Sequence, residues 1–214
     1  MCTSEVTVRR LVIGISGASG VIYGIRALEV LKAVSGIETH LVLSAAAKRT
    51  IVEETHWTPE AVESLADVVH SHRDIGAAIA SGSFRTAGML VAPCSIKTLS
   101  GIAHCYSDNL LLRAADVCLK ERRPLVLMVR EMPLHPGHID LMAAAARSGA
   151  VIAPPVPAFY NRPTTVDEIV NHSVGKALDL FGIGHQLFKR WKETDGQEAI
   201  RKVADRCDDP ASGK

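Results

Sequence analysis

Residues 11–20 read LVIGISGASG, and this stretch decides the fold. Its first half is a continuous apolar run, as expected of a β-strand that other elements cover on both faces. Its second half is a small, glycine-rich turn. Apolar positions then recur at helical spacing over residues 21–34. A strand, a tight turn and a helix in this order are typical of the first unit of a parallel α/β sheet.

The same alternation of β-branched runs and helical patterns continues along most of the chain. Further strands are predicted at residues 40–43, 68–70, 89–92, 125–129 and 151–153. Helices are predicted at residues 45–54, from Thr58-Pro59 onward, and at residues 95–103, 109–119, 139–147 and 165–180. Pro93 is expected to end the strand before it. Such repeats imply right-handed crossovers, and therefore an α/β protein with a Rossmann-like, doubly wound, mainly parallel sheet.

Length and composition fit a single domain, which we expect over residues 1–192, followed by a polar tail at 193–214. Hydrophobic residues make up 47% of the 214, which is enough for a core and argues against a disordered chain. The 24 Lys and Arg residues balance 23 Asp and Glu residues, so neither a nucleic acid nor an anionic membrane is expected as the main partner. No apolar run approaches the roughly 18 residues of a membrane span.

The cysteines and histidines give no sign of a metal site. The five cysteines are widely spaced without a C-x-x-C pair, which argues against a disulfide framework and a structural zinc site. His135 and His138 have metal-like types, but Pro136-Gly137 separates them, so capping or surface roles are expected. Residues 1–10 lack the apolar core of a signal peptide. We therefore expect a cytoplasmic protein without a metal.

Two strand ends carry residues suited to binding an anion. Gly14-x-x-Gly17-Ala18-Ser19-Gly20 would bring backbone N–H groups and a helix N-terminus towards a ligand, although a turn without a ligand is the alternative. Its spacing is neither the dinucleotide fingerprint nor a P-loop. In residues 92–98, APCSIKT, Ser95 and Thr98 could cap a helix or bind a ligand, and Cys94 is expected to be a buried thiol.

A third segment, residues 113–130, holds five cations against two anions in an otherwise neutral protein. Arg130 directly follows the strand predicted at 125–129, so it could reach a phosphate in the crevice at the end of the sheet. The sequence contains no Asp-Asp-x-x-Asp segment, which argues against chemistry on a magnesium-bridged diphosphate.

Several of these segments together resemble a known family. They are residues 16–20 (SGASG), 93–95 (PCS), 113–117 (RAADV), 119–127 (LKERRPLVL), Arg130-Glu131-x-Pro133 and 157–160 (PAFY). The chain is similar in them to the flavin prenyltransferases, the UbiX family, and the resemblance extends over about residues 10–191. It is carried mainly by the Lys-Glu-Arg-Arg-Pro and Arg-Glu-x-Pro segments.

The resemblance implies a flavoprotein that joins a dimethylallyl group from dimethylallyl phosphate to N5, and then to C6, of reduced FMN. It implies no metal. The product, prenylated FMN, would pass to a UbiD-type decarboxylase. Members of the family assemble as dodecamers built from trimers, with active sites at subunit interfaces.

The resemblance also implies site residues. FMN would contact Gly17, Ala18, Ser19, Ser44, Ser95, Ile96, Lys97, Thr98 and Arg130. Dimethylallyl phosphate would be held by Arg113, Lys120, Arg130, Glu131, Tyr160 and Lys176. The catalytic group would comprise Ser19, Glu54, Lys120 and Glu131. Cationic and hydroxyl donors can stabilise a departing phosphate without a metal. We expect the released phosphate to take the C6 proton, Glu131 to shuttle a proton and Glu54 to tune the flavin.

One departure from the family concerns residues 74–76, Asp-Ile-Gly, since some members carry an aromatic residue there that packs on the prenyl group. The flavin ring or Tyr160 would then have to stabilise an allylic cation. Three other functions stay open: a decarboxylase of phenolic acids, a flavoprotein cysteine decarboxylase and a non-catalytic FMN-binding module. Cysteine decarboxylases carry Pro-Ala-Ser-Ala-Asn-Thr where this chain has residues 93–98, PCSIKT, which argues against the second.

Overall fold

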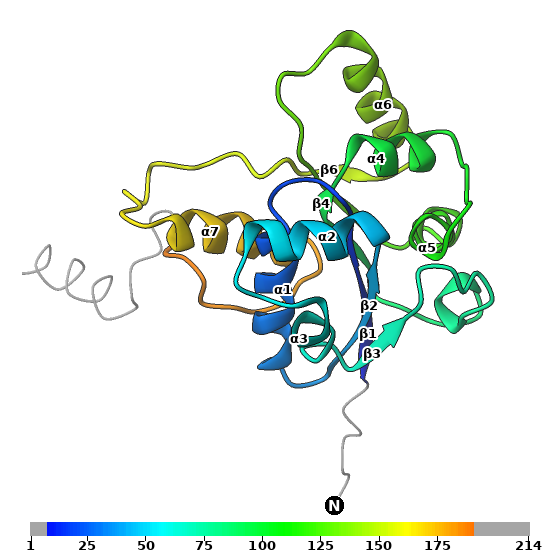
Figure 1. The fold of residues 1–214 in the computed structure, drawn as a ribbon, viewed down its shortest axis with the longest axis horizontal. Coiled ribbons are helices and arrows are strands. Elements are labelled where there is room, and N and C mark those ends of the chain that lie inside the picture. Colours follow the sequence, from blue (N-terminus) through cyan, green and yellow to red (C-terminus); the bar gives the residue numbers. More distant parts are fainter. Residues whose placement is uncertain (1–7, 191–214) are drawn as a thin grey trace, which may run out of the picture.

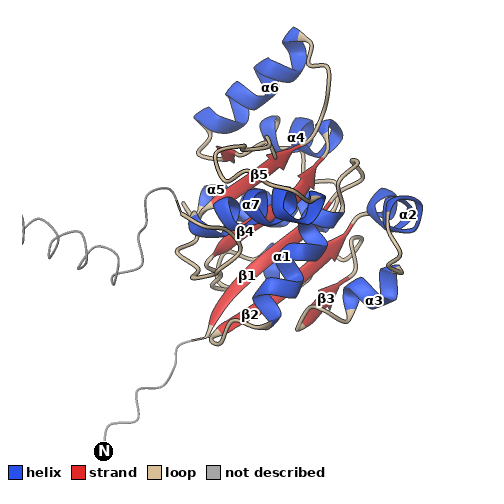
Figure 2. Ribbon diagram, turned by 90° about the vertical axis from the view of Figure 1, so that its left-hand side faces the viewer, coloured by secondary structure: helices blue, strands red, loops and turns tan. Residues whose placement is uncertain are grey.

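The computed structural model describes residues 8–190, which form one six-stranded sheet with helices on both faces (Figures 1 and 2). All strand pairs are parallel, in the order β3-β2-β1-β4-β5-β6. The strands are β1 (Arg9–Ile15), β2 (Ile37–Leu43), β3 (Val68–His70), β4 (Gly88–Cys94), β5 (Leu125–Val129) and β6 (Val151–Ile152). The order reverses between β1 and β4, which is where ligands bind in such sheets.

The helices are α1 (Ile22–Lys32), α2 (Ala45–Glu54), α3 (Pro59–Glu63), the 3₁₀ turn η1 (Ala78–Ala80), α4 (Ile96–Ala103), α5 (Leu110–Lys120), α6 (Pro136–Arg147) and α7 (Val166–Asp179). The predicted doubly wound fold is therefore confirmed. The predicted strands at 68–70 and 125–129 and the predicted helix at 45–54 also have the observed bounds. The polar tail predicted at 193–214 lies outside the described residues.

The core lies on both faces of the sheet because alternate residues of each strand point to opposite sides. Ile13 of β1 packs in the cluster with α1 and α7, whereas its neighbour Val12 packs in the cluster with α4 and α5. Both side chains are almost fully buried. This explains why residues 11–15 are apolar without alternation.

Several predicted boundaries differ from the observed ones; β2, for example, begins at Ile37 rather than at residue 40, and two of the differences have a clear local cause. β4 continues through Pro93 to Cys94. The pairing of β4 with β5 shifts register between Val91 and Cys94, so the sheet does not require a backbone N–H from Pro93 at this point. α6 begins at Pro136 rather than at 139, because the His135 side chain caps it by accepting from the backbone N–H of Gly137. His135 thus has the predicted capping role. His138, whose ring centroid lies 3.6 Å from that of His135, is instead half-buried, and its Nδ1 is buried with no hydrogen-bond partner among residues 8–190.

Candidate functional site

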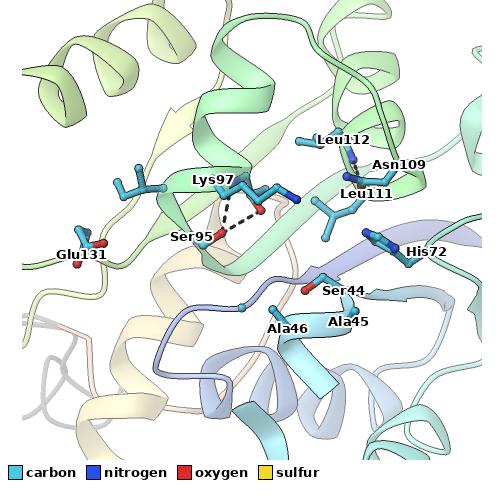
Figure 3. Close-up of a pocket in the computed structure, with 13 residues that line it drawn as sticks. Ser44, Ala45, Ala46, His72, Ser95, Lys97, Asn109, Leu111, Leu112 and Glu131 are labelled. Atoms are coloured by element: carbon cyan, nitrogen blue, oxygen red, sulfur yellow. Dashed lines mark hydrogen bonds between the residues drawn. The ribbon is translucent and has the colours of Figure 1, made fainter. Parts of the chain in front are cut away.

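A pocket of about 460 Å³ lies at the carboxyl ends of β1 and β4, where the strand order reverses (Figure 3). It is lined by Gly17, Ser44, Ala45, Ala46, His72, Ser95, Ile96, Lys97, Thr98, Asn109, Leu111, Leu112 and Glu131. These residues come from the loop after β1, the starts of α2, α4 and α5, and the loops after β3 and β5. Its size and position are those of a site for a small organic ligand.

Three helix N-termini open onto this pocket. Ser44, Ser95 and Asn109 are the N-caps of α2, α4 and α5, and each side-chain oxygen accepts a backbone N–H of its own helix. A helix N-terminus carries unpaired N–H groups and a partial positive charge, so it favours an anion. The side chain of Lys97 extends toward Asn109 and His72 in the pocket (Figure 3). The pocket therefore suits a ligand that carries a phosphate.

The glycine turn after β1 is held tightly against its neighbours. A Cβ atom at Gly17 would collide with the Cβ of Ala46 at the start of α2. Ser16 is fully buried, and its hydroxyl donates to the Pro93 carbonyl (2.8 Å) and accepts from the Ser95 N–H (2.7 Å). This pair of bonds fixes the turn against the start of α4, so both segments present their backbone to the pocket together.

Glu54 approaches the turn from the other end of α2. Its Oε2 accepts the backbone N–H of Gly20 at 2.7 Å. Gly20 has a φ of +95°, a conformation that favours glycine. Ala18 and Ser19 lie in the same turn. The structure therefore brings Glu54 together with the residues predicted to contact a flavin.

His72 and Asn109 were missed by the sequence analysis. His72 lies two residues after β3, and Ser44 directly follows β2, so the place of His72 just after a predicted strand was a usable signal. Asn109 stands before an apolar helical run, which is typical of an N-cap. Burial lowers the pKa of His72, and the charge of Lys97 lowers it further, so His72 favours the neutral form.

Two predicted residues follow β5. Glu131 lines the pocket at the end away from His72 (Figure 3), and its carboxylate accepts the Met132 N–H at 3.0 Å. The backbone N–H of Arg130 donates to the Cys94 carbonyl at 3.1 Å. Arg130 does not line the pocket, but its charge acts on Tyr23: burial raises the pKa of Tyr23 and the Arg130 cation partly offsets this.

Lys120 and Arg113 lie away from the pocket within this chain. Lys120 ends α5, about 15 Å along the helix from its N-terminus, and it precedes β5 at the opposite edge of the sheet. Its Nζ is 2.5 Å from a carboxylate oxygen of Glu121. Arg113 bonds the Ala80 carbonyl (3.2 Å) and Asp116 (2.7 Å).

Tyr160 and Lys176 form a third group, on α7 and the segment before it. The Tyr160 hydroxyl is 2.8 Å from Nε2 of His172, and Nζ of Lys176 is 3.8 Å from Asp179. One chain therefore does not bring Lys120 together with Tyr160 and Lys176.

The fold and the pocket define an α/β protein of the flavin-binding class, and the comparisons agree. A family model described as Flavoprotein matches residues 3–177. A flavin prenyltransferase UbiX from Salmonella typhimurium is 60% identical over 186 residues, which cover 86% of this chain and 98% of that protein. The chain belongs to the flavin prenyltransferases, the UbiX family, as the resemblance predicted.

Two solved structures share the fold closely. One is AnUbiX (PadA1) in complex with FMN and dimethylallyl pyrophosphate, with a TM-score of 0.85, 46% identity, and 87% of this chain and 99% of that one covered. The other is a dodecameric FMN-dependent UbiX-like decarboxylase from Escherichia coli, with a TM-score of 0.84, 50% identity and coverage of 86% and 99%.

The remaining sequence predictions concern metals and membranes. Within residues 8–190, no three His, Cys, Asp or Glu side chains gather in a way that could hold a metal ion. Over the same residues, no helix has both the length and the apolar character to cross a bilayer.

The predicted burial of the Cys94 thiol is confirmed, and Cys118 is buried as well. Burial raises the pKa of the Cys118 thiol to about 12, so Cys118 is not poised as a nucleophile.

Proposed function

We propose that this protein transfers the dimethylallyl group of dimethylallyl phosphate to reduced FMN without a metal ion. The prenylated FMN would serve a UbiD-type decarboxylase. The observation that carries the proposal is the convergence of three helix N-termini and the glycine turn on one pocket, in a member of the flavin prenyltransferase family. The cytoplasm is the proposed location.

The proposed FMN site consists of the turn and the helix starts. Six of its nine proposed residues line the pocket: Gly17, Ser44, Ser95, Ile96, Lys97 and Thr98. Ala18, Ser19 and Arg130 would contact the flavin from its margins. The residues fit FMN because N-capped helix starts and Lys97 suit its phosphate, and a glycine at position 17 allows close approach of the backbone. Bound reduced FMN supplies the N5 and C6 atoms that accept the prenyl group.

The proposed dimethylallyl phosphate site needs more than one subunit. Arg130, Glu131, Tyr160 and Lys176 would hold the phosphate, with Arg113 and Lys120 adding positive charge. Because Lys120 lies at the far edge of the sheet in its own chain, we assign it to the site of a neighbouring copy. Exposed apolar side chains near Glu131 and Tyr160 support such contacts, since Met132 is 86% exposed and Phe159 is 70% exposed.

Proton handling is the second task of the protein residues. The departing phosphate has a second pKa of about 6, so it can accept the proton that C6 of the flavin releases. Glu131, at one end of the pocket, would relay a proton between the phosphate and solvent. Glu54 would act on the flavin through the Gly20 turn that it holds, together with Ser19.

An anaerobic assay tests the proposal. The purified protein is incubated with reduced FMN, dimethylallyl phosphate and a chelator, and the released flavin is weighed by mass spectrometry. We expect the mass of FMN to increase by one dimethylallyl unit. An unchanged flavin would refute the transferase, and release of carbon dioxide from a phenolic acid or a peptidyl cysteine would favour the decarboxylase alternatives.

A further inference from the structure

The segment that carries Tyr160 has no helix or strand to fix it. Residues 155–165 lie between β6 and α7 outside regular structure, and Tyr160 is 44% exposed. The direction of its hydroxyl therefore depends on side-chain contacts. This hydroxyl lies 2.8 Å from Nε2 of His172 of α7, and the two rings meet edge to face with centroids 5.4 Å apart.

His172 also packs against a second aromatic ring, that of Phe188. The chain after α7 turns back along the helix (Figure 1, orange), and it places Phe188 against the His172 ring with centroids 4.6 Å apart. Phe188 also packs on His185 and against Gly175, where a Cβ atom would lie 2.6 Å from the Phe188 ring. The imidazole therefore contacts two aromatic rings, Tyr160 and Phe188, which together restrict how it can turn.

Asp179 anchors this returning segment to α7. Its carboxylate accepts two bonds from the Arg190 guanidinium, at 2.7 and 2.9 Å. Nε2 of His185 faces two acceptors, the Gly175 carbonyl (2.9 Å) and Asp179 (3.2 Å), so this nitrogen carries the proton. The Arg190 bonds hold the carboxylate charged and lower the pKa of Asp179. The segment that carries Phe188 is therefore bound to α7 by hydrogen bonds on both sides of Phe188 in the sequence, from His185 and from Arg190.

We infer that His172 is a positioning residue that aims the Tyr160 hydroxyl at the phosphate of dimethylallyl phosphate. The inference rests on the proposed function. A phenol has one hydrogen to give. If Tyr160 donates it to a phosphate oxygen, the bond between Tyr160 and His172 must run the other way, with Nε2–H of His172 donating to the phenolic oxygen. Burial lowers the pKa of His172, and Lys176 lowers it further, which favours a neutral ring with one N–H.

The experiment is a double-mutant cycle on substrate affinity. The protein is loaded with oxidised FMN, so that no transfer occurs, and titrated with dimethylallyl phosphate in a calorimeter. His172→Phe keeps an aromatic ring against Phe188 but removes the donor, and we expect it to weaken binding about fivefold, the factor that one net hydrogen bond supplies. His172→Gln retains an N–H donor and is expected to restore most of the affinity.

Repeating the His172→Phe substitution in a Tyr160→Phe protein distinguishes a positioning role of His172 from a loss of structure. In Tyr160→Phe the hydroxyl is absent, so adding His172→Phe should leave the affinity unchanged. FMN affinity should be the same in all variants. Equal binding by His172→Phe and the wild-type protein, or a loss of the same size in the Tyr160→Phe background, would overturn the inference. The proposed function fails separately, when reduced FMN gains no prenyl unit.

Discussion

Gly17 shows what a single residue contributes to the pocket. A methyl group at this position would meet the Cβ of Ala46, so Gly17→Ala must push the turn away from the start of α2. Overpacking of this kind costs about 1–3 kcal/mol. Because the turn is proposed to contact the flavin, we expect FMN affinity to fall about tenfold or more. Fluorescence titration of FMN measures this.

Gly184 provides the control for Gly17. No atom lies within 4 Å of a Cβ built at Gly184, so Gly184→Ala adds the same methyl group without a collision. Its FMN affinity should equal that of the wild-type protein. Similar losses in both variants would mean that the effect is not specific to the turn.

Glu131 is the second residue whose role can be isolated. Glu131→Gln keeps the size and the hydrogen-bonding oxygen that accepts the Met132 N–H, but it removes the proton-carrying carboxylate. General acid–base catalysis typically contributes 10²–10⁴-fold, so we expect the rate of prenyl transfer to fall about a hundredfold with FMN affinity unchanged. Single-turnover kinetics under anaerobic conditions measure this rate. A variant with full turnover would remove Glu131 from the proton pathway.

Among the elements, α4 combines a stability role with a proposed ligand role at one residue. Ser95 caps the helix by accepting from the Thr98 N–H at 3.3 Å, and it also lines the pocket. Ser95→Ala should cost about 1 kcal/mol of stability, the usual value of an N-cap. It should also weaken FMN binding. Thr58→Ala removes the N-cap of α3, which does not line the pocket, so urea unfolding should show a similar cost without a change in FMN affinity.

The junction of β2 and β3 makes stability depend on pH. Asp67 accepts the N–H (2.7 Å) and the hydroxyl (2.8 Å) of Thr39, and these bonds, the N–H first, lower the pKa of Asp67. In the unfolded chain the Asp67 carboxyl has a pKa near 3.9, which is above its pKa in the folded protein. As the pH falls, the unfolded state therefore binds a proton more readily than the folded state, and the stabilisation from Asp67 is lost as the pH drops to the folded pKa. Asp67→Asn should unfold more easily at pH 7 and lose less stability between about pH 5 and pH 3.

The control for Asp67 lies on α6. Asp140 is exposed on this helix, and Asp140→Asn should keep the pH dependence of the wild-type protein. Denaturant midpoints measured across the pH range give both curves. A parallel shift of the Asp67→Asn curve, without a change in slope, would contradict the assignment.

The same elements show where prediction from sequence ends. The apolar run at 11–15 and the caps Ser95 and Thr165 are local signals, so the strand and both helix starts could be read from neighbouring residues. The prediction that Pro93 ends its strand was wrong because a proline is accommodated there by a register shift between β4 and β5, and this pairing cannot be read from neighbouring residues. The contact between Tyr160 and His172 crosses a loop without regular structure, so no spacing rule predicts it.

On the scale of the whole molecule, the proposed site combines residues from different copies of the chain, and this can be tested without a structure of the assembly. In one chain Lys120 lies beside Glu121 at the edge of the sheet opposite the pocket, whereas Tyr160 lies beside α7. If both act in one site, they come from different copies. Lys120→Ala and Tyr160→Phe should each be nearly inactive alone, because each removes a proposed donor to the phosphate.

Mixed oligomers of these two variants should recover activity. When both chains are co-expressed in equal amounts and assemble at random, about a quarter of the sites pair Lys120 of one chain with Tyr160 of the other. We expect activity to reach about that fraction of wild type, because closed oligomers repeat the same interface at every site. Mixing the separately purified proteins without subunit exchange is the control and should stay inactive. Co-expressed variants that remain inactive, in oligomers shown by mass spectrometry to contain both chains, would place Lys120 and Tyr160 outside a shared site.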